Sequence, residues 1–190
     1  MKLTITLGLA LALIAGPVVA DQPTAVPAYT PEDIRSLFFD AARAGRTDLI
    51  DGLVEAGAPL EARSDGGHTA FVLAAYSGHL DTARHLAGKG ADVCAVDGQG
   101  NTAQMGVAFK GYDAVAEYLI TLDCDVDTRN RAGQTALMMA ALFGRAAQVE
   151  MLLAAGADPE IADRAGNTAL GLARQQGNET MAALLNRRGR

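Results

Sequence analysis

Three histidines and two cysteines are the side chains of this sequence whose types suit metal or thiol chemistry. His79 and His85 do not fall on one face of a helix, and no further ligand has a spacing that suits zinc. Neither Gly-x-Ser-x-Gly nor His-Glu-x-x-His occurs, and no nucleophile lies near a base at a convincing spacing. The sequence therefore predicts no metal site and no catalytic centre, and we expect that the chain is not an enzyme.

Two strings imitate ligand-binding loops. Gly98-Gln99-Gly100-Asn101-Thr102-Ala103 matches a relaxed dinucleotide fingerprint, but that fingerprint requires a preceding strand and a βαβ unit, which the surrounding pattern does not offer. Asp123-Cys124-Asp125-Val126-Asp127 resembles the start of a calcium loop, but Thr128 stands at the obligatory glycine and Gln134 at the obligatory glutamate. We therefore expect no cofactor and no bound ion.

Four Gly-x-Thr-Ala motifs lie in phase along the chain, with a step of 33 residues between their threonines. Single motifs are weak evidence, but four in register indicate that one structural unit has been copied. Helix-ending glycines recur with the same step, and so does a leucine near the end of each second helix. The motifs are Gly67-His68-Thr69-Ala70, Gly100-Asn101-Thr102-Ala103, Gly133-Gln134-Thr135-Ala136 and Gly166-Asn167-Thr168-Ala169.

This pattern predicts two helices in each unit, separated by a glycine. One helical pair cannot bury its own apolar face, whereas stacked pairs bury a continuous core. Alanine and leucine must do most of the packing, because tryptophan is absent and aromatic residues make up only 5%. We expect a repeat domain over 32–190, with units at about 32–63, 64–96, 97–129, 130–162 and 163–188.

The Gly-x-Thr-Ala-x-x-x-Ala-Ala pattern, a Leu-Leu pair and the Gly-Ala-Asp turns at 90–92 and 156–158 resemble the ankyrin repeat. The resemblance implies a mostly α fold, an α-solenoid of five ankyrin-like helix-turn-helix repeats with short hairpin loops. The proline and histidine typical of the family's Thr-Pro-Leu-His segment are absent from every copy, which predicts softer hairpins. Repeat three has Asp123-Cys124-Asp125 in place of Gly-Ala-Asp and should be the least regular unit.

The two cysteines lie in corresponding turns after repeats two and three, but Cys124 stands three places earlier in its unit than Cys94 does. A disulfide requires Cα atoms within about 7 Å of one another, whereas packed layers lie roughly 10 Å apart. The sequence leaves two alternatives open for Cys94 and Cys124: a bridge that clips the irregular repeat, or two semi-buried thiols.

The first twenty residues are typical of a bacterial secretory signal peptide. Lys2 precedes an apolar run that is too short for a comfortable membrane span, and small residues precede a cleavage site after Ala20. We expect a signal peptide at 1–20, a flexible leader at 21–31 and a periplasmic destination without membrane insertion. The formal net charge of −6 argues against nucleic acid and anionic membranes as partners.

The resemblance places the working surface on the concave face, formed by hairpin tips and the exposed side of each first helix. Large apolar residues at usually solvated positions are candidate anchors there, unless their rings fold back under the hairpins. Tyr76, Phe109 and Leu142 should form a ladder, with Phe143 beside it. The predicted partner-binding residues are Tyr76, Phe109, Lys110, Leu142, Phe143, His68, Asn101, Gln134 and Arg131.

These features favour a monomeric, non-catalytic scaffold that binds a protein partner in the periplasm through its concave groove. Two narrower alternatives follow from the resemblance to bacterial ankyrin proteins. One is an immunity or inhibitor protein for a periplasmic toxin enzyme, and the other is a stress-protective partner of a periplasmic enzyme such as catalase. An enzyme in its own right is the least favoured alternative.

Overall fold

The computed structural model describes residues 29–188, with side chains up to Asn186; the predicted signal peptide and most of the leader lie outside this range. The regular secondary structure of this part of the chain is entirely α-helical, apart from one isolated β-bridge between Val96 and Thr102, and hairpins and turns connect the helices. The helices are α1 (Pro31–Arg43), α2 (Thr47–Glu55), α3 (Ala70–Tyr76), α4 (Leu80–Gly88), α5 (Ala103–Lys110), α6 (Asp113–Ile120), α7 (Ala136–Leu142), α8 (Ala146–Ala154), α9 (Ala169–Gln175) and α10 (Glu179–Arg188).

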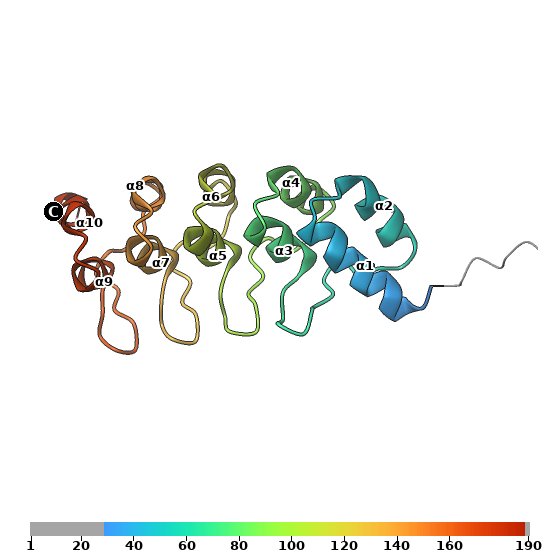
Figure 1. Cartoon of the computed structure of the whole chain (residues 1–190), viewed down its shortest axis with the longest axis horizontal. Coiled ribbons are helices and arrows are strands. Elements are labelled where there is room, and N and C mark those ends of the chain that lie inside the picture. The colour runs from blue at the N-terminus through green and yellow to red at the C-terminus, as the bar shows by residue number, and fades with distance from the viewer. Residues whose placement is uncertain (1–28, 189–190) are drawn as a thin grey trace, which may run out of the picture.

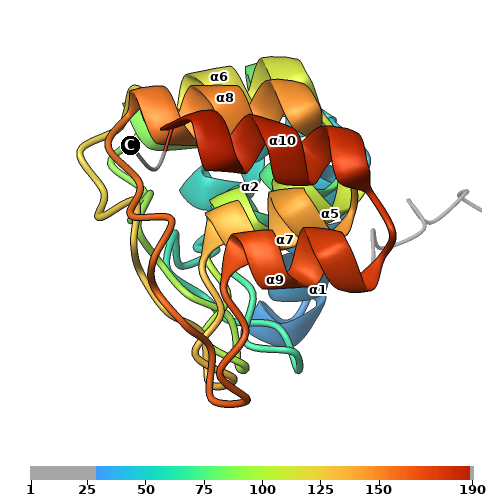
Figure 2. The ribbon, with the colours of Figure 1, turned by 90° about the vertical axis from the view of Figure 1, so that its left-hand side faces the viewer.

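The helices pair antiparallel and stack side by side, which confirms the predicted α-solenoid (Figure 1). The odd-numbered inner helices form one layer and the even-numbered outer helices form the other. Figure 2 shows these two layers end on, with the hairpins projecting from one side. None of the described helices is both long and apolar enough to cross a membrane.

The threonine of each Gly-x-Thr-Ala motif begins an inner helix. Its hydroxyl accepts a hydrogen bond from the backbone N–H three residues later, as Thr102 does from Met105 at 3.3 Å. Such N-caps satisfy a donor that the helix itself leaves unpaired. The inner helices then end at the recurrent glycines, and Gly111 shows why glycine is needed, because its φ is +85°.

The core is built mainly from alanine at the faces where inner helices meet. Ala74 and Ala75 of α3 are completely buried, and so are Ala108 of α5 and Ala141 of α7. Small side chains let neighbouring helices approach closely. At the N-terminal end of the stack, Phe38 and Phe71 are also fully buried and fill the space toward the outer layer.

Repeat three departs from the pattern where its outer helix ends. In the turns after α2, α4 and α8 a glycine with positive φ follows the helix, as at Gly90, whereas no residue of the turn after α6 has a positive φ. A disulfide joins Cys124 in this turn to Cys94 in the preceding repeat, with the Cα atoms 5.6 Å apart. The offset of the two cysteines therefore closes the gap between stacked turns, and the bridge holds the repeat that lacks its glycine.

Removing this bridge by Cys94→Ser together with Cys124→Ser should lower the free energy of unfolding by about 3 kcal/mol. The reason is that a closed loop of 30 residues no longer restricts the unfolded chain. Urea titration followed by circular dichroism measures the loss. Dithiothreitol should destabilise the wild-type chain and leave the double variant unchanged; an equal response of both proteins would contradict the stabilising role.

Candidate protein-binding groove

Each hairpin is closed by a short polar side chain at its first residue. The Asp97 carboxylate accepts hydrogen bonds from the backbone N–H groups of Gln99 and Asn101, at 2.7 and 2.8 Å. Asn130 and Asp163 accept the equivalent pairs in the next two hairpins. Such local bonds mimic a backbone turn and fix the loop.

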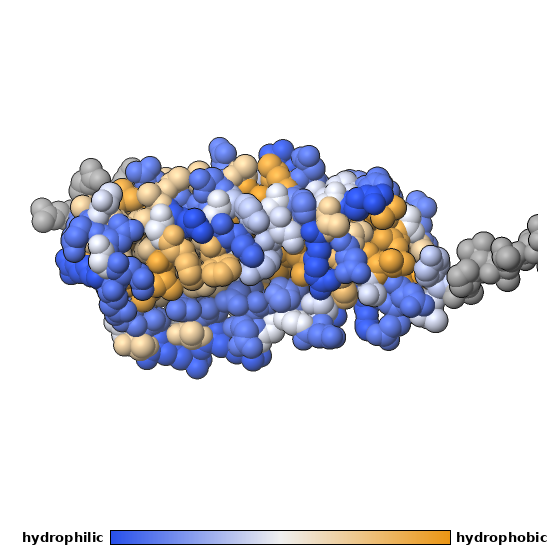
Figure 3. All heavy atoms as spheres, viewed as in Figure 1, coloured by the Kyte–Doolittle hydropathy of each residue, from blue (hydrophilic) through white to orange (hydrophobic). Residues whose placement is uncertain are grey.

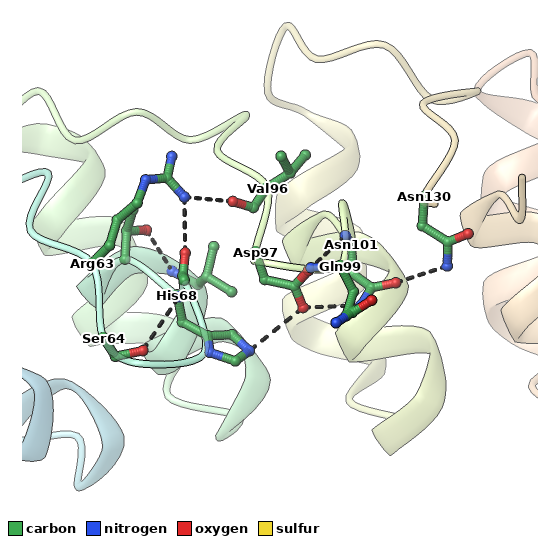
Figure 4. A network of polar contacts seen from close by, with 11 residues as sticks. Arg63, Ser64, His68, Val96, Asp97, Gln99, Asn101 and Asn130 are labelled. Carbon is green, nitrogen blue, oxygen red and sulfur yellow. Dashed lines mark hydrogen bonds and ion pairs between the residues drawn. The ribbon is translucent and has the colours of Figure 1, made fainter. Parts of the chain in front are cut away.

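Neighbouring hairpins are also tied to one another. The backbone N–H of Gly98 donates to the Gly66 carbonyl at 2.9 Å, and the same bond recurs at both later junctions. The Arg63 guanidinium donates to carbonyls on two hairpins, including that of Val96 at 2.6 Å (Figure 4). Arg129 repeats this arrangement between the last two hairpins.

These ties supply contacts that the prediction of softer hairpins did not include. The missing proline and histidine are replaced by a side chain that closes each turn and by arginines that bridge between turns. The sequence contains a signal for the side chains that close the turns, because the positions of Ser64, Asp97, Asn130 and Asp163 follow the repeat period.

Three of the predicted site residues belong to this polar network. His68 reaches across to the next hairpin, where its Nε2 lies 3.5 Å from the Asp97 carboxylate. The Asn101 side chain accepts a hydrogen bond from Asn130 at 2.8 Å, and Gln134 accepts a longer one from the same amide group. Asn101 and Gln134 therefore hold hairpins in place, while His68 and Asn101 also line a pocket of the groove.

The pKa of Asp97 lies below the ordinary value for aspartate. Burial of the carboxyl raises the pKa, but hydrogen bonds from Asn101 and Gln99 and the charge of nearby His68 lower it by more. A carboxylate with a depressed folded-state pKa contributes stability above its unfolded pKa and loses that contribution as the pH falls. The hairpin should therefore loosen in acid.

Three aromatic rings form a continuous row along the inner helices. The rings of Tyr76 and Phe109 are parallel, with centroids 6.4 Å apart, and Phe143 meets Phe109 edge-on at 4.8 Å. The Lys110 ammonium lies 4.7 Å from the Tyr76 ring centroid, which is close enough for a cation–π contact. Phe109 and Phe143 remain 39% and 37% exposed, so the outer part of the row faces solvent.

The row differs from the predicted ladder in its last member. Leu142 is half-buried and packs against the C-terminal core, and Phe143 contacts the Phe109 ring in its place. Phe143 follows the last residue of α7, where the backbone leaves the helix and the side chain can turn outward. Large apolar groups thus gather along the inner layer above the polar hairpins (Figure 3).

A pocket of about 230 Å³ opens between this row and the hairpins. It depends on Gly106, which stands where the neighbouring repeats carry Leu73 and Met139. A Cβ atom at Gly106 would lie 2.7 Å from the Tyr76 ring, so only glycine lets that ring lie against α5. The pocket wall also includes His68, Tyr76, Asn101, Met105, Phe109 and Met139.

Charge is segregated between the two layers of the last three repeats. The stretches 98–111, 131–144 and 164–177, which carry the hairpin tips and inner helices, contain no aspartate or glutamate. Lys110, Arg131 and Arg164 lie there, are exposed, and form no ion pair with any described residue. Asp97 and Asp163, which close two of the hairpins, stand directly before two of these stretches, and the other acids of these repeats lie on the outer helices and the turns after them, at Asp113, Glu117, Asp123, Asp125, Asp127, Glu150, Asp158, Glu160 and Glu179.

Replacing Asp97 with alanine should cost about 2 kcal/mol of stability, because the hairpin N–H groups lose a charged acceptor. Asp97→Asn is the matched control, since Asn130 closes the next hairpin with the same geometry. Urea titrations at several pH values should show the wild-type advantage over Asp97→Asn shrinking as the solution becomes acidic. An advantage that stays constant across this range would contradict the charged hydrogen bonds.

Comparison with known families agrees with this geometry. A model described as ankyrin repeats in three copies matches residues 104–189, and a model for ankyrin repeats in many copies matches residues 71–105. No curated protein matched the sequence. Ankyrin repeats are typically non-catalytic modules through which proteins interact. Because the matched segments cover most of the stacked helices described above, the chain belongs to the ankyrin-repeat family.

Proposed function

We propose that this protein is a non-catalytic scaffold that holds a partner protein in its concave groove. The observation that carries the proposal is the exposed aromatic row beside the Gly106 pocket. Exposed rings that flank a preformed recess are the usual anchors of protein interfaces, because their burial on binding contributes much of the affinity.

The charges of the groove indicate the chemistry of the partner segment. Lys110, Arg131 and Arg164 are exposed on the hairpin tips and the inner helices of the last three repeats, and the stretches that carry them contain no acidic residue. An acidic segment would find complementary charge there, and a basic segment would be repelled. The recess beside Phe109 would take one apolar side chain of that segment. We therefore propose a partner segment that carries carboxylates around a single apolar anchor.

The proposed site of action is the periplasm, and the proposed working form is a monomer. The sequence of residues 1–20 supports export, and the disulfide between Cys94 and Cys124 suits an oxidising compartment. The tied hairpins support a preformed groove, since a partner that meets fixed loops loses less entropy on binding.

Filling the recess should weaken partner binding by about tenfold or more, as expected for loss of a central anchor. Gly106→Met introduces the residue that repeat four carries at this position, and Gly88→Met on outer helix α4 is the control, because the space around Gly88 is open. The partner is captured from the exported fraction with the mature chain, identified, and titrated against each variant by calorimetry. Equal affinity for both methionine variants would overturn the assignment of the groove.

Reversing the charge at Lys110 should weaken partner binding, and the loss of affinity should be larger at low salt than at high salt, because ions screen exposed charges. Arg84→Glu serves as the matched control, since Arg84 lies over the Tyr118 ring on the outer layer. Titrations of Lys110→Glu and Arg84→Glu at two salt concentrations measure the difference. A partner segment rich in lysine or arginine would contradict the proposed acidic chemistry.

Export predicts a mature chain that begins at Asp21 and contains the intramolecular disulfide. Intact mass measurement of the protein expressed in a bacterial host should give the mass of residues 21–190, reduced by two hydrogens. Treatment with a reducing agent should restore those two hydrogens. Recovery of the full-length chain from the cytoplasmic fraction alone would contradict the proposed export.

A further inference from the structure

A partly buried glutamine stands in repeat three at a position where the neighbouring repeats have core residues. The equivalent residues of the neighbouring repeats are Phe71 and Leu137, whose side chains are 0% and 1% exposed, whereas repeat three has Gln104. This position follows the residue that begins the inner helix and points toward the outer layer. The chain thus places a carboxamide where its own pattern requires a large apolar group.

The carboxamide of Gln104 has no hydrogen-bonding partner among the described residues. Both Nε2 and Oε1 are buried, and neither donates nor accepts a bond. Almost all buried polar groups in folded proteins are paired, because leaving one unpaired after it has lost its water is costly. Both polar atoms of this amide are therefore available to pair with a molecule from outside the chain.

Gln104 lines a pocket of about 140 Å³ that residues of repeats two, three and four enclose, separate from the groove. Leu119 and Leu122 of repeat three and Leu152 of α8 supply apolar wall. The Cys94–Cys124 bridge forms another part of the wall and fixes the turn that surrounds the pocket. A cavity of this size holds a molecule as large as benzene.

We propose that this pocket binds a small uncharged molecule that presents a carboxamide edge to Gln104 and an apolar body to the leucines. The Gln104 amide donates through Nε2 and accepts through Oε1, so a ligand edge that carries both a donor and an acceptor satisfies both atoms. Asp125 lies at the pocket wall and disfavours an anionic ligand. A cyclic amide has the required edge, because its N–H and C=O point to the same side.

δ-Valerolactam is a suitable probe, and cyclohexanone is its matched control, since it has nearly the same shape but no N–H donor. Titration of each compound into the mature, oxidised protein is followed by two-dimensional ¹H–¹⁵N NMR. The lactam should shift the side-chain amide signals of Gln104 and the backbone signals around Cys124. Cyclohexanone should bind about tenfold more weakly or worse, because it leaves the Gln104 acceptor unpaired.

Gln104→Leu supplies the residue found at Leu137 and should abolish lactam binding while it stabilises the fold against urea. Gln104→Met provides a second apolar variant should the leucine variant fold poorly. Gln99→Leu, on an exposed hairpin tip, should bind the lactam as the wild type does. Absence of lactam-induced shifts in the wild type, which would leave only water in the pocket, overturns the proposal. Equal binding of lactam and cyclohexanone, or undiminished binding by both Gln104 variants, overturns it as well.

Discussion

One backbone hydrogen bond from each hairpin to the one before it sets the spacing of the stack. Gly98, Arg131 and Arg164 donate these bonds to carbonyls of the preceding hairpins, each at 2.9 Å. At this separation a side chain at Gly67 would collide with the backbone of Gly98, since its Cβ would lie 2.5 Å from the amide nitrogen. Gly67 is thus required by the approach of the next hairpin, and the positive φ that all four motif glycines share favours glycine in every copy.

Departures from the repeat concentrate in its third unit. Gly106 opens the recess of the groove, and Gln104 brings an unpaired amide to a second pocket on the far side of the same helix. The turn after α6 has lost its glycine, and the disulfide restores a fixed position for it. The unit that departs most from the repeat pattern is therefore the one that a covalent bond ties to its neighbour.

Much of the architecture was predictable because it repeats. The glycines, threonines and leucines that recur along the chain fix where helices begin, end and pack, so the solenoid followed from their spacing alone. The bridge between Cys94 and Cys124 could not be decided, because it depends on an offset between stacked turns that spacing does not give. The exchange of Leu142 for Phe143 depends on the direction of the backbone at the end of one helix. Gly106 could not be predicted as a site residue, because a pocket is marked by an absent side chain, whereas candidate anchors are recognised by large exposed ones.

The disulfide also changes what happens when the chain is under tension. A solenoid that is pulled from its two ends gives up its units one after another and lengthens as each unravels. The segment between Cys94 and Cys124 contains all of α5 and α6, and its ends are joined covalently. Force that travels along the polypeptide crosses from one sulfur to the other and bypasses this segment. Repeat three, with Gln104, Gly106 and Phe109, is thus shielded from stretching for as long as the bridge is intact.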